Sequence, residues 1–222
     1  MTQQKYLPEP SIILLEGSKA LGIQLTEEAI FNMLRYIDLL KSWNSKFNLT
    51  SINESQKIAV AHFLDSLTIF MVWRDHANVS LLDIGTGAGF PGLVLKIVDK
   101  SIWLTLLDKN PKRIVFLKLV ANELNLSGVS FMNLPFQDFI QKPVHYLYDT
   151  VSFRAMPKKV MRFLDLDKVL NNSGSLIRMY SGLADIDKTE LRGFREIERW
   201  TGCLPYFEFE RTVIRYQRND ND

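Results

Sequence analysis

The segment Ser80-Leu-Leu-Asp-Ile-Gly-Thr-Gly-Ala-Gly-Phe-Pro-Gly92 carries the strongest structural signal in the chain, because an apolar run leads directly into a glycine-rich turn. Residues 81–84 predict a buried parallel strand, and the glycines after it let a ligand approach the backbone closely. Pro91 suits the first turn of a following helix, where its missing N–H costs nothing. A strand, a glycine turn and a helix N-terminus in this order bind nucleotide-like ligands at the carboxyl end of a parallel sheet.

Two ligands compete for this turn. Gly87-Ala-Gly89-Phe-Pro-Gly92 matches the G-x-G-x-x-G pattern of dinucleotide-binding proteins, but the match is displaced from the strand end, which that pattern requires to be adjacent. Asp83 precedes the turn, where a carboxylate would repel a pyrophosphate and accept hydrogen bonds from a cationic or amine-bearing ligand. This favours S-adenosylmethionine, with its sulfonium and ammonium groups, over NAD. The alternative for Asp83 is that it only caps the turn, since aspartate is a frequent turn former.

A second strand and helix follow the first unit. Residues 102–107 predict a strand, and Asp108 lies at its end, about 20 residues after the first glycine of the turn, where an acidic residue binds ribose hydroxyls in nucleotide-binding folds. Both candidate ligands predict this aspartate, so it supports the fold without choosing between them. Asn110 and Pro111 predict the N-cap and first position of the next helix. The basic face of that helix is most often a solvated surface.

Composition limits the class of protein. The 222 residues form one large domain, or one domain with an extension, and can bury a substantial core. A hydrophobic share of 46% is that of an ordinary globular protein, and a formal net charge of +2 demands no polyanionic partner. The single cysteine, Cys203, excludes an internal disulfide and fits a reducing compartment. With no signal-peptide core and no run that could span a bilayer, we expect a soluble, cytoplasmic protein.

The hydrophobic pattern changes once along the chain. Residues 8–75 are mostly helical in pattern: Thr26 starts an amphipathic helix, a polar break covers residues 47–53, and a further helix covers residues 58–73. We therefore expect a helical N-terminal extension, residues 1–78, on an α/β core, residues 79–222. The core is a doubly wound, Rossmann-like sheet with an antiparallel pair at its edge, as in seven-stranded methyltransferases. Strands are expected at 81–84, 102–107, 129–133, 148–153, 174–180, 195–200 and 208–216, with helices at 91–98, 111–125 and 157–170.

Several motifs occur together in one order. They are Ser42-Trp-Asn-Ser-Lys-Phe-Asn-Leu-Thr-Ser51, His62-Phe-Leu-Asp-Ser-Leu67, the glycine turn, Leu106-Leu-Asp-Lys-Asn-Pro-Lys-Arg-Ile-Val-Phe-Leu117 and Arg154-Ala155. In these motifs the chain resembles the glucose-inhibited division protein B family, the methyltransferases that modify N7 of a guanine in 16S ribosomal RNA. The resemblance covers about residues 20–218, and its first two motifs are not general methyltransferase motifs.

The resemblance implies a class I methyltransferase fold, S-adenosyl-L-methionine as cofactor, and ribosomal RNA or the small ribosomal subunit as partner. Independently of the resemblance, we expect a monomer that works without a metal and away from membranes. With Asp83, the cofactor residues are then Gly85, Gly87 and Phe90 in the turn, Asp108 on the ribose, Phe136 and Gln137 beside the adenine, and Arg154. Arg154 is the expected catalytic residue near the methyl-transfer centre, and Lys112, Arg113 and Arg211 are the expected RNA contacts.

The chain departs from the family pattern at four positions. Ala61, Pro135 and Ser181 stand where the family commonly has basic residues, and Phe153 replaces a serine. Each lost phosphate contact lowers RNA affinity, so the RNA surface is expected to be altered while the cofactor site is intact. A member with another RNA target, or a non-catalytic RNA- or ribosome-associated module, is therefore the alternative.

The remaining polar and aromatic candidates favour structural roles. The three histidines are scattered, and His62 on an apolar helix is interpreted as a structural histidine with its hydrogen bonds satisfied. Trp43 and Phe63 are expected in the core, and Asn48 is expected to cap a helix. No nucleophile–base array and no metal-ligand spacing stands out in the sequence.

Overall fold

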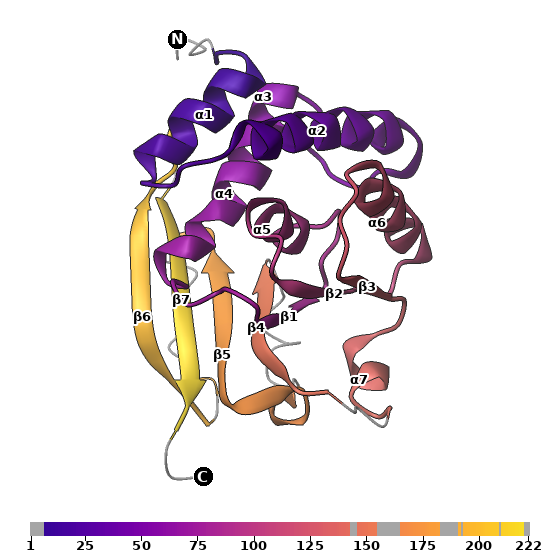
Figure 1. The fold of residues 1–222 in the computed structure, drawn as a ribbon, viewed down its shortest axis with the longest axis vertical. Coiled ribbons are helices and arrows are strands. Elements are labelled where there is room, and N and C mark those ends of the chain that lie inside the picture. Colours follow the sequence, from indigo (N-terminus) through magenta and orange to yellow (C-terminus); the bar gives the residue numbers. More distant parts are fainter. Residues whose placement is uncertain are drawn as a thin grey trace.

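A mixed sheet runs through the centre of the molecule (Figure 1). The computed structural model describes residues 7–142, 146–154, 165–182, 191, 193–208 and 210–219. Within this part of the chain the sheet has seven strands in the order β3-β2-β1-β4-β5-β7-β6, which confirms the predicted seven-stranded, doubly wound sheet. The strands are β1 (Ser80–Ile84), β2 (Trp103–Leu107), β3 (Val129–Met132), β4 (Tyr148–Arg154), β5 (Leu170–Tyr180), β6 (Phe194–Cys203) and β7 (Glu210–Arg218).

The strand pairing explains where a ligand can bind. Strands β1 to β5 pair in parallel, whereas β7 is antiparallel to both β5 and β6, which confirms the predicted antiparallel pair at the edge. The chain leaves β1 toward β2 on one side and returns through β4 on the other, so the order reverses between β1 and β4. In such sheets ligands bind beyond the carboxyl ends of the strands at this reversal. Asp83 pairs with Ser152 there.

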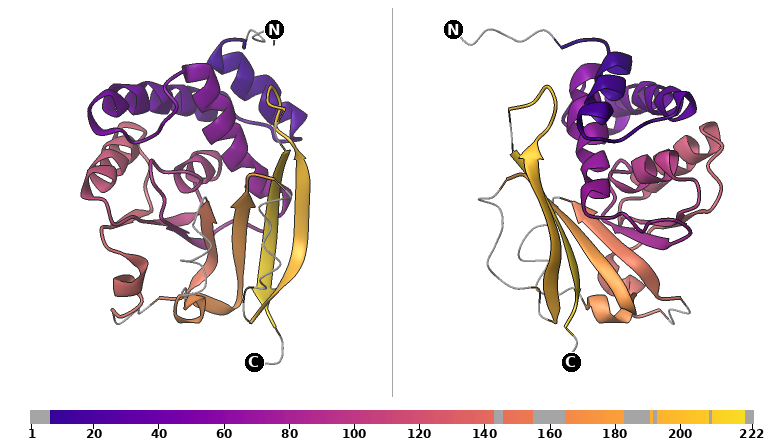
Figure 2. Two further views of the ribbon diagram at one scale, coloured as in Figure 1. Left: turned by 180° about the vertical axis from the view of Figure 1, so that it is seen from behind. Right: turned by 60° about the vertical axis from the view of Figure 1, so that its left-hand side comes forward.

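Most of the described helices cover one face of the sheet (Figure 2). Side-chain caps start two of them as predicted: Thr26 Oγ1 accepts from Ala29 N at 3.1 Å, and the Asn110 side chain accepts from Lys112 N at 3.0 Å. The helices are α1 (Pro10–Ala20), α2 (Glu27–Phe47), α3 (Ser55–Ile58), the π-helix η1 (Ala59–Leu64), α4 (Asp65–Leu67), the 3₁₀ helix η2 (Thr68–Met71), α5 (Gly92–Val98), α6 (Pro111–Glu123), α7 (Phe136–Phe139) and the 3₁₀ turn η3 (Leu166–Lys168).

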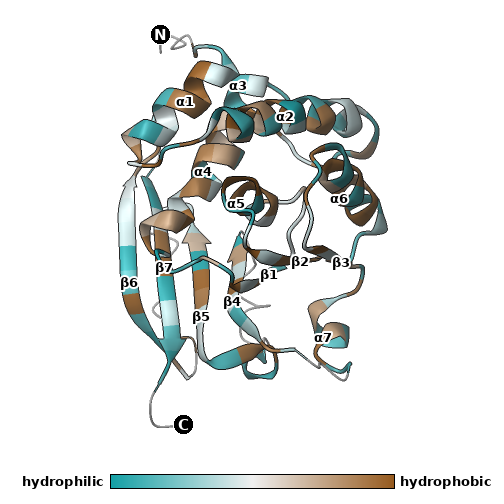
Figure 3. Ribbon diagram, viewed as in Figure 1, coloured by the Kyte–Doolittle hydropathy of each residue, from teal (hydrophilic) through white to brown (hydrophobic). Residues whose placement is uncertain are grey.

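Alternation along the central strands creates two buried clusters. Leu81 and Leu106 face the N-terminal helices together with α5 and α6, whereas Leu82 and Leu107 face a second cluster that includes residues of α7. Figure 3 shows the consequence: α5 is mainly brown, while the edge strand β6 is mainly teal and white. The helices before residue 79 therefore share one continuous core with the α/β part of the chain.

Three sequence predictions need correction. The helix expected over 58–73 is a helical run over 55–71, which changes from an α-helix to a π-helix at Ala59–Leu64 and ends in a 3₁₀ helix at Thr68–Met71. The helix expected over 157–170 falls partly on residues 155–164, which lie outside the described residues. Its described end is wrong: Leu166–Lys168 is a 3₁₀ turn, and β5 begins at Leu170, where Leu170 pairs with Tyr148. The last strand begins at Glu210 rather than at 208.

No helix in the described part of the chain is both long and apolar enough to cross a bilayer.

Candidate active site

The glycine turn leaves β1 in a backbone conformation that side chains rarely adopt. Gly85, Gly87 and Gly89 have φ values of 68°, 63° and 96°. Gly85 N donates to Leu107 O at 2.8 Å, which ties the turn to the end of β2. Gly85 is exposed, and a Cβ built on Gly87 would meet only the Gly85 carbonyl oxygen, at 3.9 Å. This side of the turn therefore has the open backbone surface that a nucleoside-bearing cofactor requires.

Asp83 caps the glycine turn, which was the alternative to a ligand contact in the sequence analysis. Its carboxylate is 0% exposed; Oδ2 accepts from Gly92 N at 3.0 Å, and Oδ1 accepts from Ser152 Oγ at 3.0 Å. Burial raises the pKa of Asp83, and these hydrogen bonds oppose the rise. The carboxylate fixes the start of α5 against β4, so the inference from Asp83 to a cationic ligand finds no support in its position. Direct contact with the cofactor stays a prediction.

Asp108 closes the turn from the end of β2. Oδ2 accepts from Gly87 N at 3.0 Å and from Arg113 Nη1 at 3.1 Å, and Oδ1 accepts from Asn110 N at 2.8 Å. This aspartate is 4% exposed and is bonded to the backbone of the second glycine, and its contact with a ribose stays a prediction. The ion pair also brings Arg113, a predicted RNA contact, to the cofactor turn.

Phe90 belongs to an aromatic stack behind the turn. Its ring is 3% exposed and stacks on Tyr36 at 5.4 Å and on His62 at 4.7 Å between centroids. The Tyr36 hydroxyl donates to the carbonyl of Ala88 within the turn. The N-terminal helices therefore pack against the glycine turn through Tyr36, a residue to which the sequence analysis assigned no role.

Arg154, the predicted catalytic residue, lies at the end of β4 beside this stack. Its guanidinium carbon lies 5.5 Å from the centroid of the Phe90 ring. Nη1 donates to Asp65 Oδ2 at 3.0 Å and to Ala61 O at 3.3 Å, and Nη2 approaches His62 Nδ1 at 3.4 Å. The structure therefore brings Arg154 next to the glycine turn, as the sequence predicted.

Arg211 reaches the same place from the C-terminal hairpin. Its Nε donates to Asp65 Oδ1 at 3.0 Å, so one carboxylate joins the predicted catalytic arginine to a predicted RNA contact. Asp65 received no role from the sequence, although it lies in the quoted His62–Leu67 motif. The signal available in the sequence was an acidic residue three positions after His62 in an otherwise apolar helical segment.

The first family motif builds the other side of this cluster. Asn44, buried on α2, donates to Thr50 O at 2.8 Å and accepts from Thr50 N at 2.8 Å, which folds the segment after α2 back on the helix. Asn48 ends α2 in the left-handed conformation, confirming its expected role as a cap. Thr50 Oγ1 then lies 2.9 Å from His62 Nε2. Phe63 is fully buried and Trp43 packs on Phe116, so both are core residues as predicted.

His62 is held neutral in this environment. Burial and then the charge of Arg154 lower the pKa of His62 to about 3. Its ring is hydrogen-bonded and stacked, so the structural interpretation made from the sequence is the one the geometry supports.

A pH dependence of folding follows from His62. Because its folded-state pKa of about 3 lies below the ordinary value near 6.5, the unfolded chain binds more protons between these values, and stability falls as the pH drops from 6.5 toward 3. We expect a loss of about 2 kcal/mol in the free energy of unfolding between pH 7 and pH 5. Urea titrations at pH 7, 6 and 5 measure it. The variant His62→Asn should show a flatter profile; parallel profiles would contradict the assignment.

The remaining predicted site residues lie on α6 and α7, outside the glycine turn itself. Phe136 is buried at the start of α7, after β3, while Gln137 beside it is exposed. Lys112 lies on α6 with its Nζ 5.4 Å from the centroid of the Phe47 ring, facing the end of α2. Of the four departures from the family pattern, Phe153 is buried and therefore changes the core and not the surface charge.

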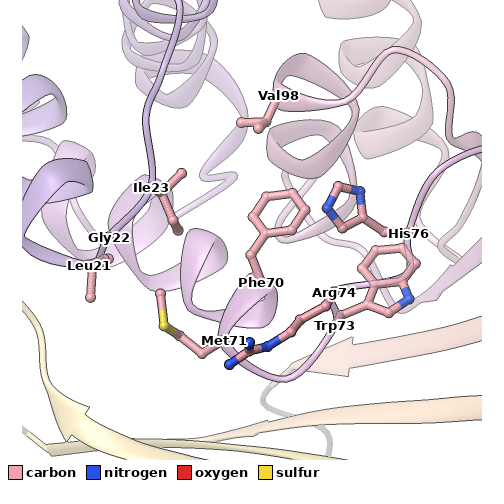
Figure 4. Close-up of a pocket in the computed structure, with 9 residues that line it drawn as sticks. All are labelled: Leu21, Gly22, Ile23, Phe70, Met71, Trp73, Arg74, His76 and Val98. Atoms are coloured by element: carbon pink, nitrogen blue, oxygen red, sulfur yellow. The ribbon is translucent and has the colours of Figure 1, made fainter.

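A separate cavity of about 420 Å³ lies among the helical segments before β1 and the end of α5 (Figure 4). It is bounded by the loop after α1, the end of η2 with the residues that follow it, and the last residue of α5. None of its lining residues belongs to the glycine turn after β1, so this cavity is distinct from the candidate site. Its lining residues are Leu21, Gly22, Ile23, Phe70, Met71, Trp73, Arg74, His76 and Val98.

Among the residues that the structure describes, no group of three or more histidine, cysteine, aspartate or glutamate side chains could hold a metal ion.

The strand order, the glycine turn after β1 and the acidic residue after β2 define a class I methyltransferase fold. Solved structures agree. A variant of MtNAS in complex with S-adenosylmethionine aligns over 94% of this chain and 77% of its own, with a TM-score of 0.59 and 16% identity. TrmN from Thermus thermophilus aligns over 70% of this chain and 48% of its own, with a TM-score of 0.55 and 14% identity. At these identities the likeness concerns the fold alone.

Sequence comparison narrows the class to one family. A model of the GidB family, described as rRNA small subunit methyltransferase G, matches residues 29–197, and the chain belongs to this family. A ribosomal RNA small subunit methyltransferase G from Alkaliphilus metalliredigens is 39% identical over 149 residues, covering 67% of this chain and 62% of the relative. The protein of the same name from Streptococcus agalactiae is 39% identical over 167 residues, covering 74% and 70%. The match thus spans about three fifths of the first relative's length.

Proposed function

We propose that this protein is an S-adenosylmethionine-dependent methyltransferase that modifies N7 of a guanine in 16S ribosomal RNA. The observation that carries the proposal is the GidB match over residues 29–197, on a fold that brings its motifs to one end of the sheet. The relatives are named ribosomal RNA small subunit methyltransferase G, and the resemblance in sequence motifs supplies the guanine N7 target.

The cofactor, when bound, supplies a methyl group already activated on a sulfonium. The residues of this chain would receive it at the open backbone of Gly85 and Gly87, with the ribose toward Asp108. Phe136 and Gln137 would flank the adenine from α7. The hydrogen bonds of Asp83 hold the start of α5 in place beneath the turn.

The acceptor chemistry of the proposed reaction requires no titrating base beside Arg154. Guanine N7 has an in-plane lone pair and no proton to lose, so no general base is needed, and His62 stays neutral because its pKa is about 3. The protein's task is to hold N7 in line with the methyl group, and positioning of this kind supplies roughly 7–11 kcal/mol of a barrier. Arg154 would anchor the guanine edge or a neighbouring phosphate through its guanidinium.

The RNA surface would extend from Arg211 on β7 to the start of α6. Lys112 and Arg113 would contact phosphates there, although Arg113 also donates a hydrogen bond to Asp108. The protein would act in the cytoplasm as a monomer, and its substrate would be ribosomal RNA or the small ribosomal subunit.

The test combines binding with rRNA mapping. Calorimetry should detect S-adenosylmethionine binding to the folded protein, and purified protein should methylate small subunits taken from a strain that lacks it. Mass mapping of 16S rRNA from that strain should show one missing methyl group on a guanine. Cofactor binding with a different missing modification would indicate another RNA target. Unchanged RNA would favour the non-catalytic module suggested by Ala61, Pro135 and Ser181.

A further inference from the structure

One buried carboxylate connects three parts of the chain that are distant in sequence. Asp65, on α4, is 5% exposed, and each of its oxygens accepts a hydrogen bond from a different arginine at 3.0 Å. Arg154 comes from the end of β4 and Arg211 from β7. Charge-assisted hydrogen bonds of this type are among the strongest in proteins, because donor and acceptor are both ionised and poorly solvated.

The π-helix before Asp65 shapes this contact. Residues Ala59–Leu64 follow the i→i+5 pattern, an irregular turn that is frequent at functional sites. The Ala61 carbonyl accepts from Arg154 Nη1 at 3.3 Å, and His62 meets Nη2 at 3.4 Å. The N-terminal helical run therefore presents a carbonyl, an imidazole and a carboxylate to one guanidinium.

The described part of the chain leaves one donor nitrogen on each arginine without an acceptor. Within the described residues, Arg154 Nε and Arg211 Nη2 make no hydrogen bond, whereas Arg211 Nη1 donates to the carbonyls of Ser181 and Glu210. Two guanidinium groups against one carboxylate leave a net charge of +1. A pair held in this way suits one anionic group, such as a phosphate of RNA, presented beside the glycine turn.

We propose that Asp65 is a positioning residue, which holds Arg154 and Arg211 side by side so that together they seat the RNA nucleotide for methyl transfer. The inference rests on the proposed function, and it makes the N-terminal helices part of the acceptor site. Asp65 itself touches neither substrate nor cofactor in this role.

Two simpler roles make different predictions. If Asp65 only neutralised charge, removing its charge would strengthen RNA binding, since an additional net positive charge favours phosphate contact, and turnover would not change. If Asp65 only stabilised the fold, activity and cofactor binding would decline together with the melting temperature. A positioning role predicts lower turnover with cofactor binding retained.

The experiment compares Asp65→Asn and Asp65→Glu with the control Asp149→Asn. Asp149 is also a partly buried carboxylate, bonded to Ser80 and Asn171 at the far end of β1. For each variant we would measure melting temperature, the Kd of S-adenosylmethionine, the Kd of small subunits, and kcat and KM for methyl transfer. For Asp65→Asn we expect kcat to fall about 100-fold, as for a misplaced reacting group, with the cofactor Kd within about 3-fold of wild type. Asp65→Glu should recover part of kcat.

The possible outcomes distinguish a failure of the positioning role from a failure of the proposed methyltransferase function. Unchanged kcat in Asp65→Asn overturns the positioning role, whether or not RNA binding tightens. Equal losses of kcat in Asp65→Asn and in Asp149→Asn at equal melting temperature also overturn it. Absence of methyl transfer by the wild-type protein would instead remove the proposed function, and the inference with it.

Discussion

Replacing Arg154 with alanine is expected to lower kcat for methyl transfer by about 100-fold or more, with cofactor binding partly retained. Arg154 lies over the Phe90 ring and meets His62 and Asp65, so it occupies the point where the glycine turn and the N-terminal helices come together. Its removal takes away the group that would hold the guanine, while the backbone of Gly85 and Gly87 is untouched. Single-turnover assays with small subunits and calorimetry with S-adenosylmethionine measure the two effects separately.

The conservative variant Arg154→Lys provides the control. A lysine keeps the charge but loses the planar set of donors that reaches Ala61 and Asp65 together, so activity should recover only slightly. Melting temperatures of both variants must be recorded, because Asp65 loses one partner. Full activity of a folded Arg154→Ala protein would exclude the residue from the mechanism.

Gly89→Ala is expected to destabilise the protein by about 3 kcal/mol or more, from backbone strain and overpacking together. Gly89 has a φ of 96°, which an alanine rarely adopts. A Cβ there would also lie 2.8 Å from Leu117 Cδ2 and 2.9 Å from Leu93 Cδ1, and it would clash with the Tyr36 hydroxyl. Either the three side chains or the turn must shift to relieve these contacts, and with the added strain at φ 96° we expect cofactor affinity to fall as well. Urea denaturation measures the free energy of unfolding.

Gly22→Ala is the matched control for this prediction. Gly22 has a φ of 72°, but nothing lies within 4 Å of its virtual Cβ, so only strain applies and a loss of about 1 kcal/mol is expected. Adding Tyr36→Phe to Gly89→Ala should recover part of the loss by removing the hydroxyl. Equal losses for Gly22→Ala and Gly89→Ala would contradict the packing argument.

The elements that the sequence predicted well are those with local signals. The Thr26 and Asn110 caps and the central strands β1 and β2 depend on residues that are neighbours in sequence. The errors occur where distant partners decide. Leu170 becomes part of β5 because it pairs with Tyr148, and the π-helix at Ala59–Leu64 faces an arginine from β4.

The candidate site divides in the same way. The sequence selected Gly85, Gly87, Asp108 and Arg154, and the structure brings them to the carboxyl ends of β1, β2 and β4, while their contacts with a cofactor stay predictions. The sequence did not decide between two roles for Asp83, and the structure shows its carboxylate bonded to Gly92 and Ser152. An acidic residue at a strand end has the same sequence signature whether its oxygens face a ligand or the protein.

The amino-acid pattern alone therefore predicted the doubly wound sheet, the position of the glycine turn and the family. These features depend on periodicity and on motifs whose residues lie close together in the chain. Only the folded molecule revealed that Asp65 joins Arg154 and Arg211. These partners lie 89 and 146 residues away from it. No local propensity encodes such contacts, since they form only when the N-terminal helices, the end of β4 and the C-terminal hairpin pack against one another.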